Sequence, residues 1–330
     1  MTQLDNRPRR ILVTGGSGFI GTNAIEALRR HGHTVINIDV APPKDPTHAS
    51  CWRQVDILDL PALRQELLSF QPEIVLHLAA RASLDGRGGL AAFAANIDGV
   101  ANMIQAIIAV GSVEHSFFTS TRLVNDLGYA PKHDRDYQAS TMYGLSKARG
   151  EELVRDASHA LGTWTILRPT GIWGPWFGVP YRDFFKTIER GLYLHPGRRT
   201  VRKAYGYVEN TVYEIETLMA QPAADVHGQT YLLTDYPAVS VREWAELIRE
   251  KLGARRIRSV PIPALRAAGA IGDVVERIGG HALLTSFRVN NMATDMVYDT
   301  SPLEAMVGRL PFSLEEGVDR TIAWLKAGAG

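Results

Sequence analysis

The sequence predicts an α/β fold, with a doubly wound parallel sheet followed by a smaller mixed lobe. Strand and helix patterns alternate through the first half of the 330-residue chain, and a glycine cluster links the first strand to the first helix. This alternation ends at Pro169. Strands alternating with helices pair in parallel through right-handed crossovers. We therefore predict a first domain over 1–170 and a second lobe over 171–330, with segments near 204–235 returning to the first domain.

The elements of the first domain follow from local patterns. Short β-rich or apolar runs predict strands at 10–14, 34–38, 73–78, 115–120 and 163–168. Apolar residues at helical spacing predict helices at 19–31, 60–70, 90–110 and 140–161. The run 73–78 is almost wholly apolar, which is typical of a strand buried on both faces.

The second half is less regular. Serine followed three residues later by glutamate, the capping-box pattern, predicts helix starts at Ser240 and Ser313. Aromatic residues gather near the beginning of this half, where they can pack a small lobe or bind a ligand. They are Trp173, Trp176, Phe177, Tyr181, Phe184 and Phe185.

Composition excludes several classes of protein. The net charge of +1 argues against a nucleic-acid or anionic-membrane partner. We expect the longest apolar stretches to be far short of a bilayer span, and the polar N-terminus to contain no secretory signal. Cys51 is the only cysteine and cannot form an internal disulfide. Together with the polar N-terminus, the single cysteine predicts a cytoplasmic protein. His77 and His195 lack partners at metal-ligand spacing, so we predict no metal site.

The glycine cluster has the spacing Gly15-x-x-Gly18-x-x-Gly21. Glycine allows the backbone to approach a pyrophosphate, whose charge the helix N-terminus stabilises. Asp39 ends the second predicted strand, where an acid can bind the adenosine ribose hydroxyls or act as a turn residue. A carboxylate there would repel a 2′-phosphate, so the pattern predicts a Rossmann domain that binds NAD rather than NADP.

A second pattern places Tyr143 four residues before Lys147. On a helix this spacing puts the phenol and the ammonium on one face. A nearby ammonium favours the phenolate, so a group whose ordinary pKa is about 10 can transfer protons nearer neutral pH.

Taken together, these motifs make the chain resemble the extended short-chain dehydrogenase/reductases, in the branch of NAD-dependent epimerases and dehydratases. The resemblance covers essentially the whole chain. Its motifs are the glycine cluster, Asp39, Asp56-Ile57, His77-Leu-Ala-Ala80, Asn96-x-x-Gly99, Phe118-Thr-Ser-Thr121, Tyr143-x-x-x-Lys147, Leu167-Arg-Pro169 and Gly174-Pro175.

The resemblance implies that Thr121, Tyr143 and Lys147 are the catalytic residues. Tyr143 would exchange a proton with the substrate hydroxyl, Thr121 would position that oxygen, and Lys147 would bind the nicotinamide ribose and lower the pKa of Tyr143. The implied NAD-binding residues also include Gly15, Gly18, Phe19, Ile20, Gly21, Asp39, Asp56, Ile57, Leu78, Ala79, Ala80, Asn96 and Pro169.

The residues after Thr121 restrict the reaction. Dehydratases of this family have an Asp-Glu pair there, and decarboxylases need the Glu, whereas this chain has Arg122-Leu123. The epimerase–reductases use a Cys and a His, and Cys51 lies outside the matching positions. What remains is reversible oxidation and reduction at a carbinol carbon, either as epimerisation with recycled NAD or as net dehydrogenation.

The substrate side departs from the family pattern. Gly171 stands where sugar-nucleotide members usually have an asparagine, while Arg202, Lys203 and Arg288 fall near the arginines that bind the diphosphate. Trp173 belongs to the aromatic group that could contact a ligand. Arg81 and Arg122 either contact a charged or hydroxyl-rich substrate or form ion pairs with Asp85 and Asp126, respectively.

Three functions are consistent with these features. The first is an NAD-dependent nucleotide-sugar epimerase or related sugar oxidoreductase. The second is an oxidoreductase of the 3β-hydroxysteroid dehydrogenase type, because the segments 168–175, 207–210 and 228–231 resemble that branch. The third is a catalytically silent NAD-binding regulatory protein. The resemblance also implies a homodimer formed by the helix of Tyr143 and the helix starting at Leu90.

Overall fold

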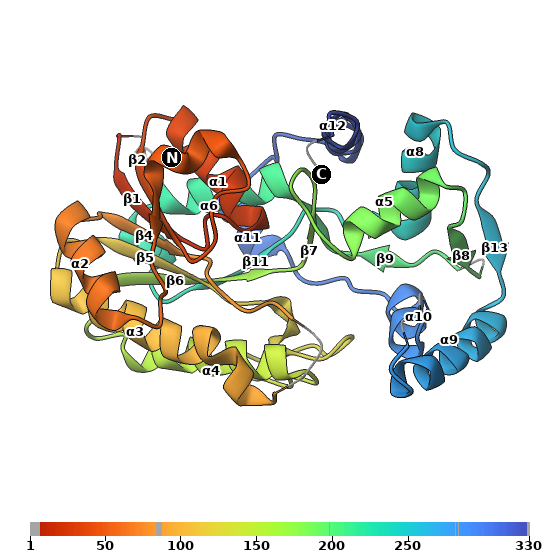
Figure 1. The fold of residues 1–330 in the computed structure, drawn as a ribbon, viewed down its shortest axis with the longest axis horizontal. Coiled ribbons are helices and arrows are strands. Elements are labelled where there is room, and N and C mark those ends of the chain that lie inside the picture. The colour runs from red at the N-terminus through yellow and green to blue at the C-terminus, as the bar shows by residue number, and fades with distance from the viewer. Residues whose placement is uncertain (1–6, 84–87, 198, 281, 283, 329–330) are drawn as a thin grey trace.

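The computed structural model describes residues 7–83, 88–197, 199–280, 282 and 284–328, and it has a large and a small lobe (Figure 1). The large lobe is built on a seven-stranded sheet of order β11-β6-β5-β4-β1-β2-β3, with parallel pairing throughout. The predicted doubly wound fold is therefore confirmed. Its strands are β1 (Arg10–Thr14), β2 (Thr34–Asp39), β3 (Trp52–Gln54), β4 (Ile74–His77), β5 (His115–Thr119), β6 (Thr163–Pro169) and β11 (Thr230–Leu233).

Helices cover both faces of this sheet (Figure 1). One face packs against α1 (Phe19–Arg30), α6 (Val208–Met219), α7 (Ala223–Val226) and α11 (Ser301–Val307). The other packs against α2 (Leu60–Phe70), α3 (Ala94–Val110) and α4 (Met142–Asp156). Two hydrophobic cores result, one on each side of the sheet. Strand β11 completes the sheet beside β6, although it follows the first segments of the small lobe in sequence.

Helix α3 and the 3-10 turn before it, Leu90–Val110, form one segment that is long and apolar enough to span a membrane, with mean hydropathy 1.4. The expectation that no apolar stretch reaches such a length is therefore wrong. The residues Met103 and Ile107 of α3 are buried in the core between the helix and the sheet. In this fold the apolar face of α3 packs against the sheet, α2 and α4.

The small lobe combines short strand pairs with helices. Its pairs are β7 (Gly171–Trp173) with β10 (Tyr205–Tyr207), β8 (Leu194–Pro196) with β13 (Arg258–Val260), and β9 (Arg202–Lys203) with β12 (Val239–Ser240). Its helices are α5 (Tyr181–Glu189), α8 (Val241–Leu252), α9 (Ile262–Arg277), α10 (Ser286–Ala293) and α12 (Leu314–Lys326). The predicted capping box at Ser313 is present, and the Ser240 side chain accepts from the Glu243 N–H at the start of α8.

Aromatic rings form the core of the small lobe. Trp173 is fully buried, and its ring centroid lies 5.1 Å from those of both Tyr207 and Trp244. Phe185 packs against the same two tryptophans. The structure thus corrects the suggestion that Trp173 contacts substrate, because its side chain is enclosed by other rings of the core.

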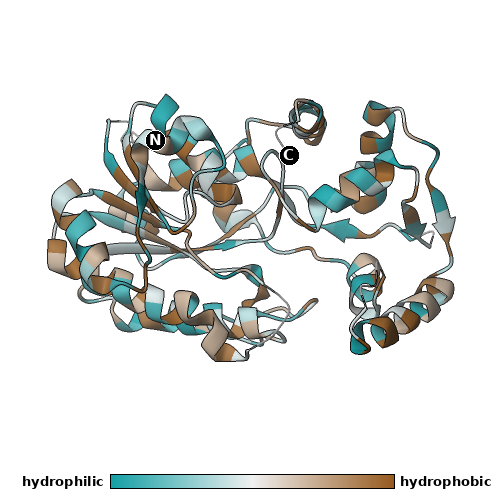
Figure 2. Cartoon of the chain, viewed as in Figure 1, coloured by the Kyte–Doolittle hydropathy of each residue, from teal (hydrophilic) through white to brown (hydrophobic). Residues whose placement is uncertain are grey.

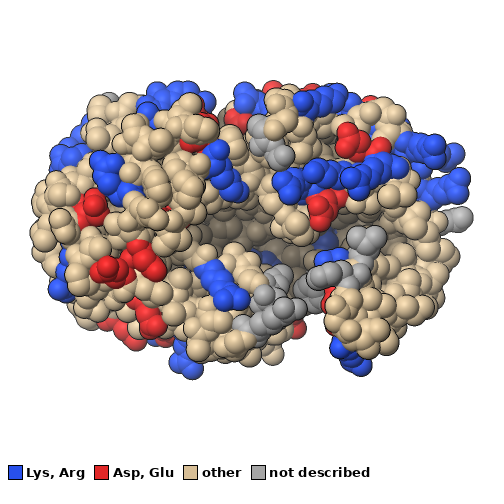
Figure 3. All heavy atoms as spheres, in the orientation of Figure 1, with Lys and Arg blue, Asp and Glu red and all other residues tan. Residues whose placement is uncertain are grey.

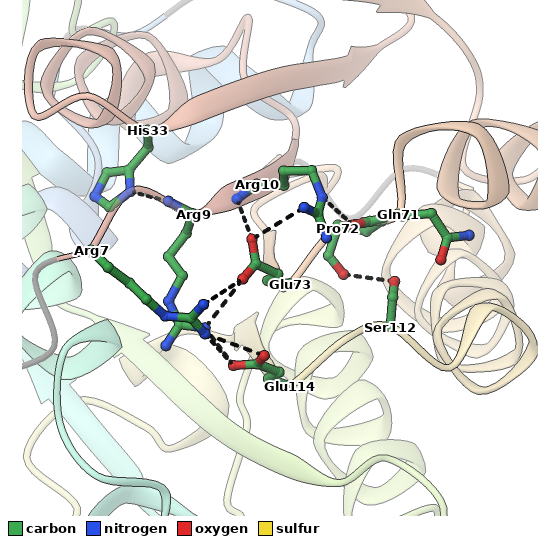
Figure 4. A network of polar contacts seen from close by, with 9 residues as sticks. All are labelled: Arg7, Arg9, Arg10, His33, Gln71, Pro72, Glu73, Ser112 and Glu114. Atoms are coloured by element: carbon green, nitrogen blue, oxygen red, sulfur yellow. Dashed lines mark hydrogen bonds and ion pairs between the residues drawn. The ribbon is translucent and has the colours of Figure 1, made fainter.

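Charged residues join the amino-terminal ends of neighbouring strands, which lie at the opposite end of the strands from the glycine cluster (Figure 4). The carboxylate of Glu73 accepts from the Arg10 N–H at 2.9 Å and pairs with the Arg9 guanidinium. Arg9 and Arg7 also pair with Glu114, which precedes β5. The backbone hydrogen bond from Arg10 is the largest cause of a lowered pKa at Glu73. This network fixes strand ends and lies away from the residues predicted to bind NAD.

Candidate functional site

The glycine cluster forms the turn between β1 and α1. Gly15 has φ +70°, and a Cβ there would lie 2.6 Å from the Ala79 backbone nitrogen, so only glycine fits. Helix α1 begins after Gly18 without a side-chain cap. Its first N–H groups are thus open to an anionic ligand, as a dinucleotide pyrophosphate requires.

Asp39 lies beside this turn. Its carboxylate accepts hydrogen bonds from the backbone N–H groups of Ser17 and Ala41, both at 3.0 Å. The carboxylate is therefore held at the carboxyl end of β2, next to the proposed phosphate site. Asp56 accepts from the Leu58 N–H, and Ile57 is buried against Gly99 of α3.

Residues after β4 connect the turn to helix α4. The Thr14 carbonyl and hydroxyl accept from the N–H groups of Leu78 and Ala79, respectively. The Asn96 side chain accepts from the Arg81 N–H at 2.8 Å and donates to the Arg81 carbonyl at 3.0 Å.

Asn96 also donates to the Ser146 hydroxyl at 2.8 Å, and that hydroxyl donates to the Tyr143 carbonyl at 2.7 Å. The Asn96 amide, expected to bind cofactor, is thus committed to protein groups that position α4. Ser146 was not identified from the sequence, because its role depends on the distance between α3 and α4.

Thr121 and Tyr143 meet where β5 and α4 approach each other. Thr121 is buried, and its hydroxyl accepts from the Leu123 N–H at 3.2 Å. Burial raises the pKa of Tyr143, and a hydrogen bond with the Thr121 side chain opposes this rise. Tyr143 lies at the start of α4, whose first turn Thr141 caps by accepting from the Gly144 N–H.

Lys147 lies one turn further along α4. It is buried, and its Nζ donates to the Thr119 carbonyl at 2.5 Å. Burial lowers the pKa of Lys147 to about 8, with the Glu151 carboxylate opposing this shift. Burial dominates the pKa of Tyr143 and raises it, so the lowering expected from Lys147 together with the oxidised nicotinamide stays a prediction.

Arg81 and Arg122 lie near the predicted catalytic residues but make different contacts. Arg81 is exposed, donates to the Ala92 carbonyl and stacks 5.3 Å above the Phe93 ring, which packs against Tyr143. Its suggested partner, Asp85, lies outside the described residues.

Arg122 is buried and its guanidinium donates to main-chain carbonyls. The acceptors are Asn125, at 3.0 Å, and Asp126, at 3.2 Å. The Asp126 carboxylate accepts instead from the Ser140 hydroxyl. Burial lowers the pKa of Arg122, and the charge of Asp126 is among the effects that oppose this shift. The guanidinium also stacks 4.7 Å from the Tyr298 ring. Hydrogen bonds to carbonyls rather than a direct carboxylate pair thus hold Arg122.

Lys203 is a second buried cation close to Arg122. Its Nζ donates to the Asn291 carbonyl at 2.6 Å and to the Asn291 side chain at 3.0 Å. Burial and, to a smaller extent, the charge of Arg122 lower the pKa of Lys203 to about 8, and Asp295 opposes this shift. Arg122 and Lys203 therefore form a pair of repelling buried cations, which an anionic group would stabilise.

The other predicted substrate residues have separate contacts. Arg202 and Arg288 are exposed, and they donate through Nη1 to the carbonyls of Ala238 and Ala282, respectively. A Cβ at Gly171 would lie 2.0 Å from the Tyr181 hydroxyl, which explains why no asparagine stands there. Tyr181, one of the aromatic residues noted in the sequence, thus fills the space beside Gly171.

The surface is hollowed between the two lobes (Figure 3). A cavity of about 590 Å³ opens next to Arg122 and Tyr298. It extends past Arg168 to Tyr231 of the edge strand β11. Arg168 itself is held by Glu151 of α4 at 2.7 and 2.8 Å.

The two histidines noted in the sequence are both buried. His77 contacts the Thr14 hydroxyl at 2.8 Å, and burial lowers its pKa to about 3. His195 contacts the Tyr193 hydroxyl. Within the described ranges, no group of three His, Cys, Asp or Glu side chains could hold a metal ion.

The structure has a glycine turn against Ala79, an acid at the end of β2, and Thr121, Tyr143 and Lys147 where β5 and α4 meet. This is the arrangement expected of a dinucleotide-binding oxidoreductase. The model of the NAD dependent epimerase/dehydratase family matches residues 11–233, more than half of the chain. The chain belongs to this family, an extended short-chain dehydrogenase/reductase group, and its cofactor is NAD.

Relatives of known activity include a sugar epimerase and a hydroxysteroid dehydrogenase. The chain is 27% identical to the N-acetyl-α-D-glucosaminyl-diphospho-ditrans,octacis-undecaprenol 4-epimerase of Escherichia coli O157:H7, over 95% of this chain and 94% of that one. It is 28% identical to a 3β-hydroxysteroid dehydrogenase/Δ5→4-isomerase of Mycobacterium tuberculosis, over 74% of this chain and 70% of that one.

Solved structures share the fold. UDP-glucose 4-epimerase of Thermotoga maritima, with UDP-glucose, aligns with a TM-score of 0.74 at 21% identity, covering 97% of this chain and 100% of that one. The Bordetella bronchiseptica enzyme WbmG, in complex with NAD and UDP, aligns with a TM-score of 0.73 at 21% identity, covering 98% and 96%.

Proposed function

We propose that this protein is an NAD-dependent epimerase, or a closely related oxidoreductase, of diphosphate-activated sugars such as nucleotide-sugars. The observation that carries the proposal is the buried cation pair Arg122 and Lys203, next to Thr121. Two repelling cations in a buried site favour a substrate that brings negative charge. A sugar diphosphate brings that charge, whereas an apolar alcohol does not.

The catalytic group would act on one carbon of the sugar. NAD accepts and returns a hydride when it is bound. Tyr143 takes the proton of the substrate hydroxyl at its phenolic oxygen and returns it, and Thr121 holds the same substrate oxygen in position. Lys147 would bind the nicotinamide ribose through its Nζ. Arg122 and Leu123 supply no acid for loss of water, so the chemistry stays at the carbinol.

The epimerase relative supports this proposal because its match spans nearly all of both chains and its substrate is a sugar diphosphate. The carrier of that diphosphate is a polyprenol rather than a nucleoside. We therefore include both carriers in the proposed substrate class.

A hydroxysteroid-type oxidoreductase is the second candidate. Tyr181 occupies the space beside Gly171, so the site lacks the asparagine side chain that the family uses for a diphosphate. The match to 3β-hydroxysteroid dehydrogenase also favours this candidate, over a smaller share of the chain. It predicts net NADH formation with an apolar alcohol.

The test is incubation with UDP-, GDP- and polyprenyl-diphosphate sugars, followed by NMR or chromatography. We expect a new stereoisomer to form without added reductant. Conversion of none of these sugars, together with NADH formation from an apolar alcohol, would replace the first candidate by the second.

Variants of the cation pair sharpen this test. Lys203→Met and Arg122→Ala should each raise the KM for a sugar diphosphate about tenfold or more, because a charged hydrogen bond contributes roughly 1.5–3 kcal/mol. The Kd for NAD should stay unchanged. Arg202→Ala is the matched control, since its guanidinium binds the Ala238 carbonyl. Equal KM values in all three variants would remove the pair from the substrate site.

We further propose a cytoplasmic homodimer formed through α3 and α4. Ile108 of α3 and Met142 of α4 are exposed apolar residues that such an interface would cover. Ile108→Glu should convert the dimer to a monomer in sedimentation experiments. A wild-type protein that sediments as a monomer would contradict this assembly.

A further inference from the structure

Helix α9 has an apolar face that nothing in the described chain covers. Its inner side packs against α10 through Leu265, Gly269 and Gly272, which are buried. On another side, Ile271, Val274 and Ile278, the last at the helix end, are 67%, 55% and 80% exposed. Their spacing of three and four residues places them in one row along the helix. Figure 2 shows apolar residues along α9, at the end of the small lobe.

The same end of the molecule is strongly basic. The segments 186–203 and 253–291 contain twelve lysine and arginine residues but three acidic ones, a net charge of +9 compared with +1 for the whole chain. Figure 3 shows many of the lysine and arginine side chains gathered on this lobe. The exposed residues include Arg255, Arg256 and Arg258 before α9 and Arg266 and Arg277 within it. The net charge of the whole chain is close to zero, but positive charge is concentrated at this end of the molecule.

We propose that α9 docks this lobe on an anionic lipid surface. A helix with one apolar side and flanking arginines inserts its apolar row at the boundary of headgroups and acyl chains. Arginines near the surface are attracted to anionic lipids. This docking is peripheral and does not involve α3.

Charge favours this partner over a second copy of the chain. Two copies meeting through α9 would bring two ends of net charge +9 together, and like charges at an interface repel. An anionic lipid surface would bury the apolar row and attract the arginines beside it.

The docked lobe would lie close to the proposed substrate site. Lys203 donates to Asn291 of α10, and α10 packs against α9. The lipid surface would thus lie one helix away from the buried cation pair. This inference goes beyond the proposed function and does not depend on it.

The test uses the full-length protein and vesicles. We expect it to sediment with equimolar phosphatidylcholine and phosphatidylglycerol vesicles, to be released by high salt, and not to bind phosphatidylcholine alone. The double variant Arg255→Ala/Arg256→Ala should lower the vesicle partition coefficient about thirtyfold. The double variant Ile271→Asp/Ile278→Asp should lower it at least as much.

Matched controls lie on α2 in the large lobe. Leu68 is 53% exposed and Arg64 is also exposed. Leu68→Asp and Arg64→Ala should leave vesicle binding unchanged. Circular dichroism and the Tm establish that each variant is folded, and turnover of a water-soluble substrate should be the same in the α9 variants as in the wild type.

Several results would overturn the proposal. They are absence of binding to the anionic vesicles, α9 variants that bind like the wild type, and controls on α2 that lose binding equally. A change of oligomeric state in the Ile271→Asp/Ile278→Asp variant, with vesicle binding kept, would instead make α9 an interface between copies. The experiment measures vesicle binding and not turnover. Its outcome therefore tests the docking proposal even if the proposed enzyme activity is not found.

Discussion

The protonation of Tyr143 sets the expected pH dependence of the reaction. Burial raises the pKa of Tyr143, so the phenol keeps its proton at neutral pH and must lose it before accepting one from substrate. We therefore predict that kcat/KM rises with pH above neutrality. The hydrogen bond with Thr121 opposes the pKa shift. Thr121→Val should thus move the rise to higher pH, while Thr121→Ser should keep it in place.

The control for this prediction is Tyr143→Phe. It should lower kcat by about 10²–10⁴-fold and abolish the pH-dependent rise, with unchanged Tm and NAD affinity. A pH profile that is the same in the wild type and in Thr121→Val would show that the hydrogen bond does not tune Tyr143.

Residues whose roles depend on local spacing could be predicted from the sequence. Tyr143 and Lys147 lie one helical turn apart, so the pattern itself brings them to one face. The proximity of Arg122 to Lys203 depends on how the two lobes pack, and that of Tyr181 to Gly171 depends on how α5 packs against β7 within the small lobe. Single-sequence reasoning has no access to these distances, nor to the burial that raises the pKa of Tyr143.

The turn between β1 and α1 gives a prediction about one element. A Cβ at Gly15 would clash with the backbone after β4, so Gly15→Ala must displace the turn that would hold the pyrophosphate. We expect this variant to lose NAD affinity by at least about 100-fold, since several charge-assisted hydrogen bonds depend on the turn. The measurement is the Kd for NAD by calorimetry.

Gly32→Ala is the control for that substitution. Gly32 also has a positive φ, +86°, but a Cβ there meets open space. It should lower stability by about 1 kcal/mol through backbone strain and leave NAD affinity unchanged. Equal losses of NAD affinity in the two variants would mean that backbone strain, rather than the approach to Ala79, is responsible.

Element boundaries were predicted best where the pattern is strong. The predicted strand 10–14 and helix 60–70 coincide with β1 and α2. The predicted helix 140–161 is shorter in the structure, because Thr141 caps it at the start and it ends at Asp156. The segment 90–110 begins with a 3-10 turn before α3. Strands β3 and β11 have three and four residues, too few for a periodic pattern.

At the scale of the molecule, the repeated strand–helix alternation was enough to predict the large sheet. The small lobe could not be predicted in the same way, because its strands have two or three residues and pair with distant segments. The net charge of the whole chain also does not reveal the basic end formed by 186–203 and 253–291.

Two buried acids of the large lobe predict how the free energy of unfolding depends on pH. Glu214 of α6 and Asp235 after β11 are both buried. Burial raises the pKa of Asp235 to about 7, and burial together with the charge of Asp235 raises that of Glu214. The unfolded chain releases these protons near pH 4, whereas the folded chain holds them longer. Stability should therefore fall as pH rises from about 4 to about 7 and stay lower above that.

Removing the charge of Asp235 should remove this penalty. Asp235→Asn keeps an oxygen that can accept from Asn210, whose Nδ2 lies 3.1 Å from Asp235 Oδ1. We expect the variant to be more stable than the wild type by about 2–4 kcal/mol near pH 8 and nearly equal to it near pH 4, which denaturant titrations at both values can measure. Glu189→Gln, at an exposed position of α5, should show no such difference. A gain of stability for Asp235→Asn that is the same at both pH values would mean that the ionisation of Asp235 is not its cause.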